Sequence, residues 1–191
     1  MRKPDASGVT AVILAAGSAT RMGVQKLLLP VRGVAMIDRV IEACADFPTL
    51  VVASPQIAEH LRASEVTVVL NTEADRGMSH SLRLAHAAIA PERAIAVFLG
   101  DKPLVTRELA RRVVKAAQAA SADVCFPQRD GVGGHPVYFS PRARDRIAGL
   151  SGDTLQSLRD APGLCRAIVP TAEEGAYLDI DDPGALHALE E

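Results

Sequence analysis

Residues 12–30 read VILAAGSATRMGVQKLLLP, an apolar run that breaks into small residues around Gly17 and Gly23. The segment VTAVILA at 9–15 shows no alternation of polar and apolar side chains, which predicts a strand buried on both faces. After the break, glycines let main-chain N–H groups approach a ligand closely. The stretch therefore predicts a buried strand that ends in a turn suited to an anion, although an ordinary strand-to-helix turn accounts for the same residues.

Arg21 and Lys26 supply the positive charge of this turn, the first as a planar fork and the second as a mobile ammonium. Two well-known phosphate loops do not fit. The ATPase loop requires lysine and Ser/Thr directly after its second glycine, where this chain has Val24 and Gln25. The dinucleotide loop requires Gly-x-Gly-x-x-Gly, which the spacing here does not provide.

Length and composition favour one globular domain. The chain has 191 residues, 48% of them hydrophobic, and a net charge of -2. This charge disfavours nucleic acid as a partner, because phosphate contacts are usually made by a basic excess. Three widely spaced cysteines match no zinc or disulfide pattern, so we expect reduced thiols in or near the core. With no apolar segment long enough to span a bilayer, we expect a cytoplasmic protein with no membrane partner.

Short apolar runs alternate with helical segments along the chain. The further predicted strands are 50–54, 66–70, 94–100, 123–127, a short one within 131–140, and 176–180. The predicted helices are 35–47, 54–63, 79–90, 106–120, 141–150 and 182–191. This order predicts a three-layer α/β/α, Rossmann-like domain with a mainly parallel sheet. We expect residues 1–8 to form a flexible tail and 9–191 a single domain.

Ligands of such sheets bind beyond the carboxyl ends of the strands. Asp101 follows the strand at 94–100, where one carboxylate suits Mg²⁺ or merely caps a turn. Asp179 and Asp181 alternate at the end of the predicted strand 176–180, so they are expected on one side. We expect Mg²⁺ between Asp101 and one of these two carboxylates.

Three further residues are candidates in neighbouring turns. Ser79, after Gly77, can cap the helix that follows, and a helix start also favours an anion or a base carbonyl. Asn71 can read a base edge or satisfy loop backbone. His135 follows a glycine-rich turn, where a structural or ligand-orienting role is favoured over that of a general base.

The opening segment closely resembles the signature loop of nucleotidyltransferases with the nucleotide-diphospho-sugar transferase fold, L-A-x-G-x-x-x-R-M-G followed by K-x-L-x-P. The matching positions are Leu14, Ala15, Gly17, Arg21, Met22, Gly23, Lys26, Leu28 and Pro30. Within that fold, the motifs NTEADRGMSHSLRLA, FLGDKPLV, GGHPVYF, GLSGD and LDIDDPGAL resemble those of the molybdenum cofactor cytidylyltransferase group. The resemblance extends from residue 10 to 189. It implies transfer of CMP from CTP to the terminal phosphate of molybdopterin, with Mg²⁺ and release of pyrophosphate.

The resemblance also implies roles for individual residues. Catalysis would rest on Arg21, Lys26 and Asp101. The nucleotide would be held by Leu14, Ala15, Ala16, Gly17, Arg21, Lys26, Asn71, Gly77, Ser79 and Asp101. Mg²⁺ would be bound by Asp101 with Asp179 or Asp181, and the pterin acceptor would face His135 and Asp153. A recipient molybdoenzyme is a further implied partner.

The chain departs from this group at several positions. Lys102 stands beside the expected metal ligand where the group has an uncharged residue, and Thr154, Leu155 and Gln156 replace a G-A-R segment in the half expected to bind the acceptor. A guanylyl-transferring sister group reads L-A-G-G where this chain has Ala16, so Ala16 favours cytidine. The alternatives are guanylyl transfer, a sugar-1-phosphate acceptor, and a non-catalytic nucleotide-binding regulator of a molybdoenzyme.

Overall fold

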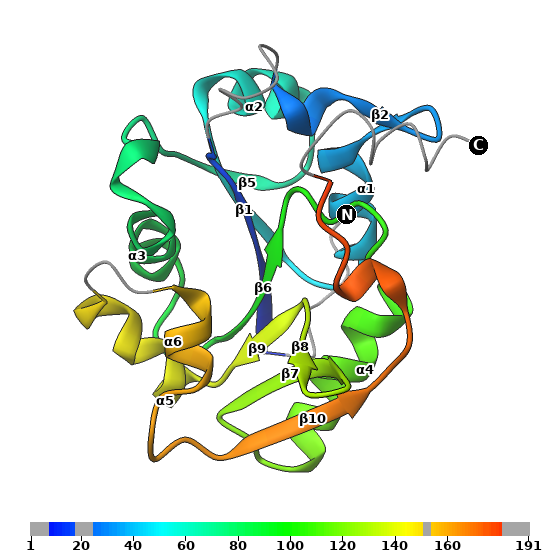
Figure 1. Cartoon of the computed structure of the whole chain (residues 1–191). Helices are drawn as coiled ribbons and strands as arrows, with labels where there is room; N and C mark the ends of the chain where they lie inside the picture. The colour runs from blue at the N-terminus through cyan, green and yellow to red at the C-terminus, as the bar shows by residue number, and fades with distance from the viewer. Residues whose placement is uncertain (1–7, 18–24, 151–153, 181–191) are drawn as a thin grey trace.

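The computed structural model of the chain describes residues 8–17, 25–150 and 154–180. Its centre is an eight-stranded sheet (Figure 1). In spatial order the strands are β10 (Arg166–Pro170), β7 (Val124–Arg129), β9 (Val137–Phe139), β6 (Ala94–Leu99), β1 (Val9–Ala15), β4 (Thr49–Ala53) and β5 (Thr67–Leu70), with β8 (Val132–Gly133) paired to β7. β9 runs antiparallel to β6 and β7, and β8 runs antiparallel to β7, whereas the other strands run parallel.

Helices cover both faces of this sheet, as the three layers in Figure 1 show. One face carries α1 (Met36–Ala43), α2 (Pro55–His60) and α4 (Arg107–Ala119), and the other carries α3 (Met78–Ala88), α5 (Pro141–Arg144) and α6 (Leu155–Arg159). Because both faces are covered, Ala11, Val12 and Ile13 of β1 are all fully buried. The three-layer α/β/α prediction with a mainly parallel sheet is confirmed.

Shorter elements complete the fold. Short 3-10 helices lie at Lys26–Leu28, Leu61–Ala63, Ala74–Arg76, Asp145–Gly149 and Glu174–Ala176. A separate antiparallel ribbon joins β2 (Pro30–Val31) to β3 (Val34–Ala35). None of the helices within the described residues has the length and apolar character needed to span a bilayer.

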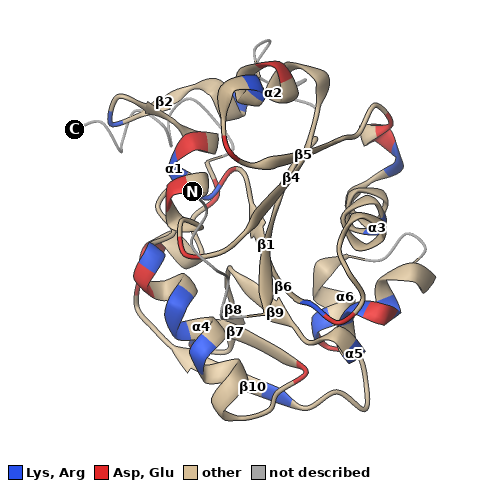
Figure 2. Cartoon of the chain, turned by 180° about the vertical axis from the view of Figure 1, so that it is seen from behind, with Lys and Arg blue, Asp and Glu red and all other residues tan. Residues whose placement is uncertain are grey.

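Charged side chains tie the helices of one face together. Figure 2, the view from behind, shows Lys and Arg in blue along α4 and acidic residues in red on α1. The turn after α1 contains Asp46, which accepts hydrogen bonds from Arg107 and Arg111 of α4. These two guanidinium groups hold the pKa of Asp46 well below its usual range.

Most predicted strands are confirmed, and one is wrong. The strand at 9–15 is found as predicted, and those at 50–54, 66–70, 94–100 and 123–127 differ at their ends by one or two residues. Residues 176–180 form no strand: the carbonyls of Ala176 and Tyr177 accept from the His135 N–H and the Lys102 ammonium, so they are not available for strand pairing. β10, which pairs with β7, takes the outer position instead. The predicted tail 1–8, apart from Gly8, and the predicted helix 182–191 lie outside the described residues.

Candidate active site

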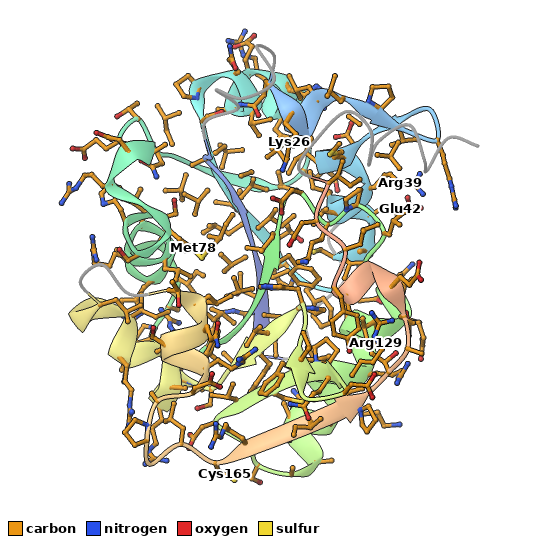
Figure 3. All side chains as sticks on the ribbon, in the orientation of Figure 1. Lys26, Arg39, Glu42, Met78, Arg129 and Cys165 are labelled. Atoms are coloured by element: carbon orange, nitrogen blue, oxygen red, sulfur yellow. The ribbon has the colours of Figure 1, made fainter. Side chains whose placement is uncertain are left out.

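Two turns meet at the carboxyl edge of the sheet, where β1 and β6 end side by side. Leu14 of β1 is in register with Leu99 of β6, so the turns that follow these strands lie next to each other. Lys26 follows the first strand and Asp101 the second, and the Lys26 Nζ lies 3.2 Å from the Asp101 Oδ2. Lys26 is labelled at this upper edge in Figure 3. The structure thus brings together two of the residues that the resemblance assigned to catalysis.

Gly100 makes the close approach of these turns possible. Its N–H donates to the Leu14 carbonyl at 3.0 Å. A Cβ at this position would lie 2.9 Å from the Leu27 Cδ1 and 3.2 Å from the Leu14 oxygen. A side chain here would therefore displace Leu27, and with it the adjacent Lys26, from the carboxylate of Asp101.

One oxygen of Asp101 lacks a partner. Oδ2 accepts from Lys26, whereas Oδ1 is buried and has no hydrogen bond within the described part of the chain. A buried anionic oxygen left unpaired is costly, and a hard divalent cation that also binds substrate phosphates satisfies it. Among the described residues no three His, Cys, Asp or Glu side chains gather to hold a metal. The donor set thus fits Mg²⁺ bound through Asp101, with substrate oxygens and water as the further ligands.

Gln25 holds the helical turn that carries Lys26. Its side-chain oxygen accepts from the Leu27 N–H at 3.4 Å, and its Nε2 donates to the Ser54 Oγ at 3.3 Å. Ser54 in turn caps α2 by accepting from the Ile57 N–H. Sequence reasoning used Gln25 only to exclude the ATPase loop. The sequence feature that could have indicated this structural role is the side-chain amide of a residue directly before Lys26.

The first turn presents small residues, as predicted. Ala15 and Ala16 are buried, Leu14 is half-buried and Gly17 is exposed. The Ala15 carbonyl accepts from the Ser54 N–H at 3.3 Å, which joins this turn to the end of β4. Arg21, Asp153 and Asp181, which the sequence also assigned to the site, lie outside the described residues.

Asn71 uses its side chain within the protein. Its Nδ2 donates to the Ser81 Oγ at 2.9 Å, and its Oδ1 accepts from the Glu73 N–H at 2.9 Å. Asn71 is 2% exposed. Of the two predicted alternatives, the observed contacts match the one in which Asn71 satisfies the loop.

The expected N-cap role of Ser79 is wrong. Helix α3 begins at Met78 with Gly77 as its N-cap, and no side chain caps it. Gly77 has φ of 80°, a conformation that glycine adopts without strain, and this lets the chain enter the helix one residue earlier. Ser79 lies inside the first turn of the helix and is 4% exposed. Its role in nucleotide binding stays a prediction.

Asp179 meets a lysine in this structure. The Lys102 Nζ lies 2.7 Å from the Asp179 Oδ1 and donates to the Tyr177 carbonyl at 2.9 Å. The Ile180 N–H donates to the Asp101 carbonyl at 3.4 Å, so the segment 177–180 lies against the turn after β6. The sequence thus correctly placed Asp179 near Asp101. The expected strand-end geometry is wrong, and the carboxylate is bound to Lys102.

His135 lies at the same edge, before β9. Its N–H donates to the Ala176 carbonyl at 2.9 Å, and its imidazole hydrogen-bonds to the backbone of Val97. Burial and the nearby ammonium of Lys102 lower the pKa of His135 to about 4, so the ring is neutral at physiological pH. Its Nδ1 is buried and has no hydrogen-bond partner among the described residues.

The two glycines before His135 are packed closely against other parts of the protein. A Cβ on Gly133 would be 2.0 Å from a nitrogen of Arg159, and a Cβ on Gly134 would be 2.6 Å from the Ala176 carbonyl oxygen. The guanidinium of Arg159 also stacks over the Phe126 ring, with its carbon 4.7 Å from the ring centroid. The glycines at this turn therefore make room for the protein's own side chains and backbone.

The chain matches known proteins over most of its length. A family model described as MobA-like NTP transferase domain matches residues 11–168. A probable molybdenum cofactor guanylyltransferase of Natranaerobius thermophilus is 30% identical over 64% of this chain and 62% of its own length. A molybdenum cofactor cytidylyltransferase of Escherichia coli is 24% identical over 70% of this chain and 71% of its own length. This chain therefore matches less than two thirds of the first of these relatives.

Solved structures share the fold. Rv0371c of Mycobacterium tuberculosis H37Rv superposes with a TM-score of 0.80 at 27% sequence identity. The superposition covers 95% of this chain and 96% of that chain.

Proposed function

Because the chain belongs to the MobA-like NTP transferase domain family, we propose that it transfers CMP from CTP to the terminal phosphate of molybdopterin, with release of pyrophosphate. The observation that carries this proposal is the Lys26–Asp101 pair, in which one carboxylate oxygen of Asp101 is buried and unpaired. The relatives named for transfer to the molybdenum cofactor support this class of acceptor.

The reaction needs no nucleophile from the protein. A phosphate oxygen of the acceptor forms a bond to the α-phosphorus of CTP, and the bond from that phosphorus to the α,β-bridging oxygen breaks, so pyrophosphate leaves. Catalysis then consists of positioning and of stabilising the charge that develops on the leaving group. The ammonium of Lys26, with the guanidinium of Arg21, would bind the phosphates and stabilise the negative charge on the leaving pyrophosphate.

Asp101 would hold Mg²⁺ through its unpaired oxygen. When bound, Mg²⁺ supplies positive charge to the phosphate oxygens as a Lewis acid. The hydrogen bond from Lys26 to the other oxygen would orient the carboxylate before the substrates arrive. Gly100 and Gln25, which set the positions of Leu27 and Lys26, would maintain this arrangement.

Transfer of GMP from GTP is the second candidate, and the guanylyltransferase from N. thermophilus favours it. Ala16, which is buried at the end of β1, supports cytidine because the guanylyl group carries glycine at this position. The enzyme, once it has made the dinucleotide, would pass it to a recipient molybdoenzyme.

Pyrophosphate release from each of CTP, GTP, ATP and UTP, with purified molybdopterin and Mg²⁺, tests the proposal. We expect kcat/KM for CTP to exceed that for GTP by about tenfold or more, the scale on which a single pocket discriminates substrates. A preference for GTP would establish the second candidate instead. No release above that of the Lys26→Ala variant with any nucleotide would contradict nucleotidyl transfer to this acceptor.

A further inference from the structure

Lys102 is a buried cation that directly follows Asp101, the residue that would bind the metal, in the sequence. Its side chain is 5% exposed, although lysine is rarely buried to this degree without a partner. Its ammonium is held by the Asp179 Oδ1 at 2.7 Å and by the Tyr177 carbonyl at 2.9 Å. Taking such an ammonium out of water is favourable only when an anion compensates it. Asp179 provides that anion.

The contact between Lys102 and Asp179 also reduces the negative charge that is available to bind a divalent cation. Asp101 and Asp179 lie on segments that touch through the hydrogen bond from the Ile180 N–H to the Asp101 carbonyl. Two carboxylates on touching segments would attract a divalent cation more strongly than one does. Each carboxylate has one lysine partner, Asp101 through its Oδ2 at 3.2 Å from Lys26 and Asp179 through its Oδ1 at 2.7 Å from Lys102. The two differ in that the Asp101 Oδ1 is buried and has no hydrogen-bond partner among the described residues.

We propose that Lys102 neutralises Asp179 and thereby excludes it from metal binding, so that a divalent cation binds through Asp101 and depends on the phosphates of the nucleotide for most of its affinity. The sequence predicted a metal between Asp101 and either Asp179 or Asp181, and for Asp179 the structure shows the Lys102 ammonium as the partner of the carboxylate. The inference rests on the proposed function only in requiring a divalent cation beside Asp101.

Binding of Mn²⁺, followed by its electron paramagnetic resonance signal without turnover, tests this inference. The variants are Asp101→Asn, Asp179→Asn, Lys102→Met and the double variant Lys102→Met/Asp179→Asn, each with and without CTP. In wild type we expect weak Mn²⁺ binding alone and much tighter binding with CTP. Lys102→Met frees Asp179, so we expect Mn²⁺ without nucleotide to bind about tenfold more tightly, as added ligand charge does at other cation sites.

The other variants complete a double-mutant cycle. Asp179→Asn keeps an oxygen that can accept from Lys102, and we expect its Mn²⁺ affinity to equal that of wild type. The double variant removes the freed carboxylate and returns to wild-type affinity, whereas Asp101→Asn binds Mn²⁺ more weakly than wild type both with and without CTP. Circular dichroism of each variant checks that it is folded.

Two results would overturn the inference. One is a loss of Mn²⁺ affinity in Asp179→Asn as large as in Asp101→Asn, because Asp179 would then be a ligand. The other is unchanged affinity in a folded Lys102→Met variant, because Lys102 would then not control Asp179. In both cases nucleotidyl transfer can still proceed, whereas a wild-type chain that binds no Mn²⁺ even with CTP contradicts both this inference and the metal role in the proposed function.

Discussion

Lys26 and Asp101 are residues whose chemistry depends on each other. The lysine orients the carboxylate, and the carboxylate keeps the ammonium at the end of β1. We expect Lys26→Ala and Asp101→Ala each to lower kcat/KM for pyrophosphate release by about a hundredfold or more, since each removes preorganised charge. Lys115→Ala, an exposed lysine of α4, is the matched control and should retain normal kinetics. Near-normal turnover in either site variant would contradict this mechanism.

His135 makes stability depend on pH. Its pKa is about 4 in the folded chain and about 6.5 when unfolded. Between these values the unfolded chain binds a proton that the folded chain does not, so the stabilisation is complete above about pH 6.5 and is lost as the pH falls toward 4. We expect the free energy of unfolding to fall by up to ~1.4 kcal/mol per pH unit more in wild type than in His135→Asn.

Urea denaturation of both proteins at several pH values between about 7 and 5 measures this difference. The other histidines are the same in both proteins, so the difference isolates His135. Equal slopes in the two proteins would show that His135 keeps its ordinary pKa.

Residue types at this site were largely predictable, and their hydrogen-bond partners were not. Lys26 and Asp101 stand at strand ends, and parallel strands bring their carboxyl ends to one edge, so their meeting follows from the order of elements. The pairing of Asp179 with Lys102 depends on the conformation of the segment 177–180, which no local sequence pattern predicts. Asn71 shows the same limit, because both base recognition and a loop hydrogen bond require the same amide.

At the scale of elements, the 3-10 helix Glu174–Ala176 is packed directly onto the turn after β6. A Cβ on Gly175 would lie 2.0 Å from the Leu104 carbonyl oxygen. We expect Gly175→Ala to lower the free energy of unfolding by about 2 kcal/mol, because the backbone must move apart. Gly149→Ala is the control, since a Cβ there meets nothing within 4 Å. Equal urea midpoints for the two variants would contradict the tight packing.

Strands were predicted correctly where burial on both faces of the sheet produces a continuous apolar run in the sequence. β1, β4 and β6 are continuous apolar runs of this kind, and each was found within one residue of its predicted ends. The run at 176–180 is hydrophobic at four of five positions, yet its carbonyls accept hydrogen bonds from a lysine side chain and from a loop N–H. β9 has only three residues, and nothing in so short a run indicates that it lies between β6 and β7.

At the scale of the whole molecule, the number of reactive cysteines distinguishes the native protein from the unfolded one. Cys44 and Cys125 are buried, and burial raises the pKa of Cys125 to about 11, whereas Cys165 is exposed. Figure 3 shows Cys165 at the lower edge, far from Lys26. We expect one thiol to react rapidly with a disulfide reagent in the native protein and all three in denaturant.

The two slow thiols should react only as fast as the whole domain opens, because both belong to the core on the α1 and α4 side of the sheet. The Cys165→Ser variant removes the rapid phase and serves as the control. A second rapid thiol in the native protein would mean that this core opens locally.

The position of β9 also has a consequence for synthesis of the chain. β9 lies between β6 and β7 but follows both of them in the sequence. As the polypeptide leaves the ribosome from its amino terminus, β1, β4, β5 and β6 are complete at Leu99, yet the free side of β6 stays open until Phe139 has emerged. During that interval its backbone groups are a template for another nascent chain. When β9 pairs with β6, it covers this open strand edge. The antiparallel strand therefore ends the period in which β6 can pair with another chain.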